Sequence, residues 1–80
     1  MKDNLKLYVE QTESLIENKD SAKLQEFLDS LHISDIEDLI DELPEEAAQI
    51  IDTMSINRAI SVFRILDVPT QERVLEKLPK

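Results

Sequence analysis

The sequence of 80 residues contains no cysteine, no glycine and no tryptophan. Without cysteine there is no disulfide framework, no thiolate zinc site and no cysteine nucleophile. Without glycine the chain lacks the phosphate-cradling loops and the dinucleotide fingerprint of nucleotide-binding proteins. The composition therefore excludes nucleotide binding of the familiar kinds and suits a reducing compartment.

Long apolar runs are also missing. No stretch approaches the roughly 18 apolar residues that a transmembrane helix needs. The first residues lead into a polar amphipathic segment and not into the apolar core of a secretory signal. We therefore expect a soluble segment, even if it belongs to a membrane protein. Apolar residues make up 41% of the chain, which is enough for one helical domain over residues 1–80.

Positive charge is absent from the middle of the chain. Between Leu24 and Asn57 there are ten acidic residues and no Lys or Arg, and the net charge of the chain is −9. Seven of the acidic residues fall within twelve positions: Asp35, Glu37, Asp38, Asp41, Glu42, Glu45 and Glu46. Such a surface repels nucleic acid and anionic lipid and attracts divalent cations or a basic partner. We expect no nucleic-acid binding and no direct membrane insertion by this segment.

An apolar triplet recurs about every twelve residues. Its members stand at positions one, two and five of each copy, so they share one helical stripe. The five copies are Phe27-Leu28-Leu31, Leu39-Ile40-Leu43, Ile50-Ile51-Met54, Val62-Phe63-Leu66 and Val74-Leu75-Leu78, at steps of 12, 11, 12 and 12. Leu15 and Ile16 begin a sixth copy, whose third position is Lys19. Helices this short must stack to bury their stripes. The repeat predicts an all-α fold, a right-handed, α-solenoid-like superhelix of five to six short helices.

Capping residues and prolines predict where these helices begin and end. The candidate N-caps are Asp20 or Ser21, Ser34 and Ser55. Ser34 and Glu37 match a capping box, Pro44 suits a first helical position, and Pro79 stops the last helix. The expected helices cover about 3–18, 21–31, 35–43, 44–54, 56–66 and 70–78. No helix follows the last triplet, so we expect a fragment of a longer array or an end covered by another chain.

Catalytic constellations are weak in this sequence. The single histidine, His32, lies in a predicted corner beside Ile33 without a neighbouring nucleophile, whereas a catalytic triad needs a histidine held between two partners. Paired carboxylates need a concave pocket to separate their pKa values, and short helices with polar exteriors give no sign of one. We do not expect an enzyme.

The acidic run is the candidate metal site. On the predicted helix after Ser34, Asp35, Asp38 and Glu42 are spaced by three and four residues and share one face, with Asp41 and Glu45 alongside. Magnesium is often held by one or two carboxylates while it keeps several waters. No EF-hand loop is present. The acidic face is therefore either a plain solvated surface or a weak, diffuse field that Mg²⁺ screens.

The run from Leu31 to Pro44, LHISDIEDLIDELP, resembles the opening of the cytosolic N-terminal domain of MgtE-type magnesium transporters. That opening typically reads L-H-P-x-D-[IL]-A-x-[LI]-[LI]-x-x-L-P. The segments 58–63 and 74–79 resemble later repeats of the same domain. Two positions depart from the family pattern: Ile33 stands where proline is usual, and Ser61 where many members have an acidic residue.

The resemblance implies a superhelical domain, here the first part of a larger one. In full-length members, paired CBS domains and a five-helix transmembrane pore follow, assembled as a homodimer. The implied function is that of a non-catalytic, magnesium-sensing regulatory module on the cytoplasmic face of the inner (plasma) membrane. The family's magnesium-sharing positions lie beyond Lys80, so no ligand is carried over. A helical-repeat protein–protein interaction module like that of the flagellar motor switch protein is the alternative.

Overall fold

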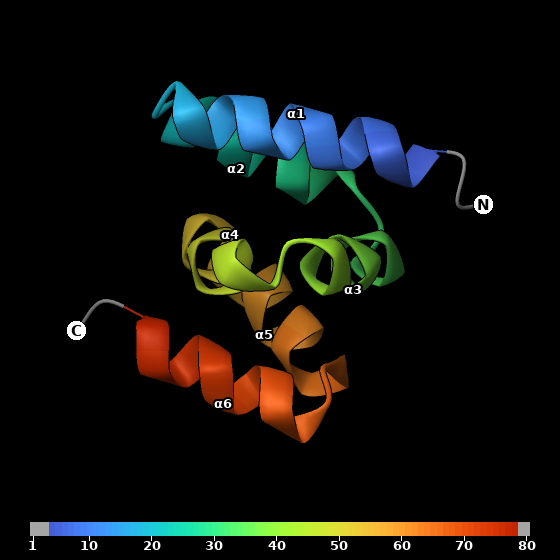
Figure 1. The fold of residues 1–80 in the computed structure, drawn as a ribbon, viewed down its shortest axis with the longest axis vertical. Coiled ribbons are helices and arrows are strands. Elements are labelled where there is room, and N and C mark those ends of the chain that lie inside the picture. Colours follow the sequence, from blue (N-terminus) through green and yellow to red (C-terminus); the bar gives the residue numbers. More distant parts are fainter. Residues whose placement is uncertain (1–3, 79–80) are drawn as a thin grey trace.

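The structure is a computed structural model that describes residues 4–78, and within that range the chain forms helices without strands (Figure 1). The elements are α1 (Leu5–Glu17), α2 (Ser21–Ser30), α3 (Ile33–Glu42), the short 3₁₀ helix η2 (Pro44–Glu46), α4 (Ala47–Thr53), α5 (Ile56–Ile65) and α6 (Val68–Lys77). The predicted all-α fold is confirmed. Two expected boundaries, Asp3 at the start and Pro79 at the end, lie outside the described residues.

Two predicted helix starts are wrong. α3 begins at Ile33 with His32 as its N-cap, so Ser34 lies inside the first turn and forms no capping box. The reason is packing, because this earlier start lets Ile33 pack against the core. α6 begins at Val68 and not at Thr70, because the side chain of Asp67 caps it and the first turn tolerates proline.

Three corners share one backbone geometry. In each, the third residue of an apolar triplet and the N-cap of the next helix both adopt extended angles. The pairs are Leu31-His32, Met54-Ser55 and Leu66-Asp67. For example, Leu66 has φ −73° and ψ 151°, and Asp67 has φ −71° and ψ 161°. Extended angles suit any L-residue, which explains how this chain turns its corners without glycine.

The corner between α1 and α2 is built differently. Lys19 has φ 57°, in the left-handed region, and its amide donates to the carbonyl of Ile16. The amide of Asp20 donates to the carbonyl of Leu15. These two bonds form a Schellman motif, the usual way to satisfy carbonyls at a helix end. Lys19 is the third residue of the incomplete copy that Leu15 and Ile16 begin, so in this copy the third position forms the turn.

Each helix packs against the second helix after it. The pairs α1 with α3, α2 with α4, α3 with α5 and α4 with α6 are all in contact. α1 and α6 therefore lie at opposite ends of the stack, with α3 and α4 between them (Figure 1). This order is compatible with the predicted superhelix, and the right-handed sense of the superhelix stays a prediction.

Most of the core consists of triplet residues together with one further position in four of the repeats. The fully buried triplet members include Leu28, Leu39, Ile40, Ile50, Val62 and Val74. Leu24, Ile36, Ala47 and Ala59 fill the position four residues before the second triplet member. The ring of Tyr8 on α1 meets that of Phe27 on α2 edge-on, with 6.1 Å between centroids. The stripes of α3 and α4 are thus sealed by their neighbours, as the repeat predicts, whereas Phe63 on α5 is half-buried and Leu75 on α6 is exposed.

Thr12 interrupts this apolar pattern on α1. Its side chain is fully buried, and its hydroxyl has no hydrogen-bond partner. A buried hydroxyl without a partner costs about 1–3 kcal/mol. We expect Thr12→Val to raise the free energy of unfolding by about 1 kcal/mol, because it replaces the hydroxyl with a methyl of similar shape. Urea unfolding of both proteins measures this difference, and a Thr12→Val protein less stable than the parent would show that the hydroxyl is bonded in solution.

Candidate functional site: an acidic side and an uncovered end

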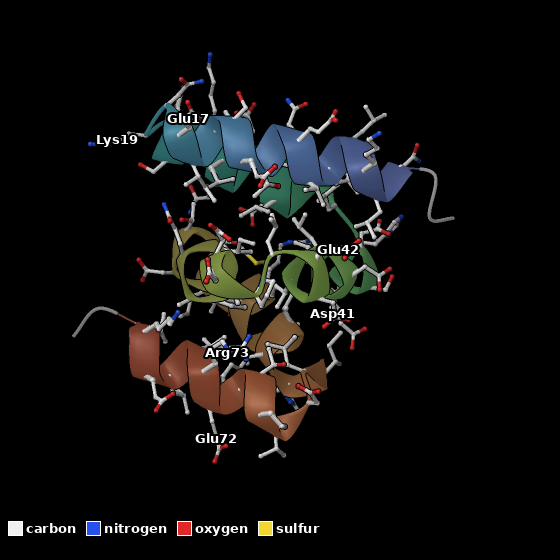
Figure 2. All side chains as sticks on the ribbon, in the orientation of Figure 1. Glu17, Lys19, Asp41, Glu42, Glu72 and Arg73 are labelled. Atoms are coloured by element: carbon white, nitrogen blue, oxygen red, sulfur yellow. The ribbon has the colours of Figure 1, made fainter. Side chains whose placement is uncertain are left out.

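The predicted metal-site residues lie on α3 and at the start of η2. Asp41, Glu42 and Glu45 are exposed, whereas Asp35 and Asp38 are half-buried. Glu42 points to the side of α3 that faces α1, and Asp41 points to the opposite side (Figure 2). Consecutive helical residues differ by about 100° in direction, so the run spreads around α3 and does not converge.

Within residues 4–78, no basic side chain forms an ion pair with this acidic run. Within residues 4–78 the ion pairs are Lys23 with Asp20, at 3.9 Å, and Arg58 with Asp29, at 3.6 Å. No three His, Asp or Glu side chains in the described part of the chain are grouped so that they could hold a metal ion. The diffuse field expected from the sequence stays a prediction. The seven carboxylates from Asp35 to Glu46 make the surface of α3 and η2 strongly negative, and we call this surface the acidic side.

The pairing of Arg58 with Asp29 joins two distant helix ends, and the sequence did not predict it. The guanidinium of Arg58 on α5 donates to the carbonyls of Leu28, at 3.3 Å, and of Leu31, at the C-terminal end of α2. The carboxylate of Asp29 accepts a hydrogen bond, at 3.3 Å, from the backbone amide of Ser55, which is the N-cap of α5. Each charge sits at the helix end that favours it, so this network fixes α5 against α2.

His32 and Asp67 both occupy N-cap positions, with different results. His32 is exposed and its side chain makes no capping hydrogen bond. The carboxylate of Asp67 accepts the amide of Thr70 at 3.1 Å. Hydrogen bonds from the side chain and the amide of Thr70 lower the pKa of Asp67, because they stabilise the charged form. Both residues act as corner residues in this fold.

The side of α5 and α6 that no helix within residues 4–78 covers is largely apolar, with Glu72 between Val68 and Leu75 on α6. We call it the terminal face, and its members are Ile56, Ile60 and Phe63 on α5 with Val68 and Leu75 on α6. The three members on α5 are spaced by four and three residues, and the two members on α6 by seven. The members on each helix therefore lie on one side of it. Ile56 is 72% exposed, Ile60 49%, Val68 64% and Leu75 62%, and Phe63 is half-buried.

Two of these five positions are buried in the preceding helices. Ile40 on α3 and Ile51 on α4 correspond to Phe63 and Leu75, and they are only 1% and 7% exposed. α5 contacts α3 and α6 contacts α4. The terminal face is therefore the surface on which a further pair of helices would stack.

Comparisons of the chain with family models, with curated proteins and with solved structures gave no match. No helix within residues 4–78 has the length and apolar character needed to cross a membrane.

Proposed function

We propose that the chain is a non-catalytic regulatory module of a magnesium transporter, one that responds to Mg²⁺ through its acidic side. The observation that carries this proposal is the unneutralised charge of α3 and η2. Seven carboxylates between Asp35 and Glu46 form no ion pair within the described residues. The run that resembles the transporter domain covers this same segment.

The proposed response is electrostatic. Two like charges about 8 Å apart repel by roughly 0.5 kcal/mol in water, and several such pairs act within α3 and η2. Divalent cations that gather near the carboxylates reduce this repulsion, and they also reduce repulsion from a second acidic surface. A docking equilibrium between acidic domains would then shift by about 1–3 kcal/mol, the usual size of an allosteric coupling.

We expect millimolar MgCl₂ to raise the Tm of the chain by about 4–8 °C above its value in NaCl of equal ionic strength. This rise corresponds to about 1 kcal/mol for a domain of this size. Differential scanning calorimetry measures it. A variant with Asp38→Asn, Asp41→Asn, Glu42→Gln and Glu45→Gln should lose most of the magnesium-specific rise, because it removes the central carboxylates.

The matched control removes four exposed carboxylates elsewhere, with Glu10→Gln, Glu13→Gln, Glu17→Gln and Glu26→Gln. It should keep the response to Mg²⁺. Equal responses of the two variants, or an equal effect of NaCl, would contradict a role for the acidic run. The coding sequence on either side of the 80 residues tests whether they belong to a magnesium transporter. Paired CBS domains and apolar membrane spans encoded there would support the proposal, and a flagellar motor switch domain would reject it.

A helical-repeat protein–protein interaction module is the second candidate, and the terminal face favours it. Exposed isoleucine, valine and leucine side chains at register positions are typical of surfaces that bind other proteins. A module of this kind should bind its partner with the same affinity with and without Mg²⁺. A binding titration at both conditions separates the two candidates.

A further inference from the structure

We draw no further inference here: the strongest candidate, the open groove between α1 and α3 that Leu5, Lys6, Val9 and Glu42 line, carries no proposal, because a basic and an acidic side chain both line it and nothing in the structure shows what covers it.

Discussion

Leu39→Ala is expected to lower the free energy of unfolding by about 2–5 kcal/mol, the cost of removing a buried leucine and leaving a cavity. Leu39 is fully buried on α3, the helix that packs between α1 and α5. Since a domain of this size has about 5–15 kcal/mol of stability at most, this single change should remove a large share of it. The Tm should fall by about 4–8 °C for each kcal/mol lost.

Leu75→Ala is the control for this prediction, measured at a concentration where the chain is monomeric. It makes the same chemical change at an exposed position of another triplet, and surface substitutions usually change stability by less than about 0.5 kcal/mol. Calorimetry of the parent and both variants gives the comparison. A loss below half a kcal/mol for Leu39→Ala would show that the triplets do not form the core.

Arg58→Ala is expected to cost about 2–3 kcal/mol, because it deletes hydrogen bonds from a charged donor to the end of α2. The carbonyl of Leu31 loses this donor, and Asp29 is left without its ion pair. Arg58→Lys should restore less than half of the loss, since a single ammonium does not reproduce the planar fork of the guanidinium. Urea unfolding measures both values.

Arg64→Ala provides the matched control, because Arg64 is an exposed arginine on the same helix. It should change stability by less than about 0.5 kcal/mol. If Arg58→Ala and Arg64→Ala had the same small effect, the network between α2 and α5 would not contribute to the fold.

The sequence predicted the core because the triplet follows the period of the fold. The N-cap positions Asp20, His32, Leu43, Ser55 and Asp67 recur at the same steps of 12, 11, 12 and 12 as the triplets. The prediction for α3 failed because a local capping motif was preferred to this spacing. Burial of a whole stripe outweighs one cap of about 1 kcal/mol, so the period sets the boundary.

The candidate site was predicted less completely than the core. Exposure of Asp41, Glu42 and Glu45 follows from their polar positions around α3. The contact of Arg58 with Asp29 joins residues 29 positions apart. The spacing of apolar residues within one helix does not tell which other helix packs beside it, so this contact could not be predicted from the sequence. Of the last triplet, which the sequence predicted to be uncovered, Leu75 is exposed, whereas Val74 is fully buried and Leu78 half-buried. The α5 members of the terminal face, Ile56 and Ile60, required knowledge of which helices pack together.

Each helix stacks on the second helix after it, and this order determines which side of α5 and α6 stays uncovered. Methyl–methyl nuclear Overhauser effects in a sample with labelled Ile, Leu and Val side chains test it directly. This stacking order predicts methyl contacts between α1 and α3, α2 and α4, α3 and α5, and α4 and α6. A spectrum in which α3 and α5 share no methyl contacts would contradict it.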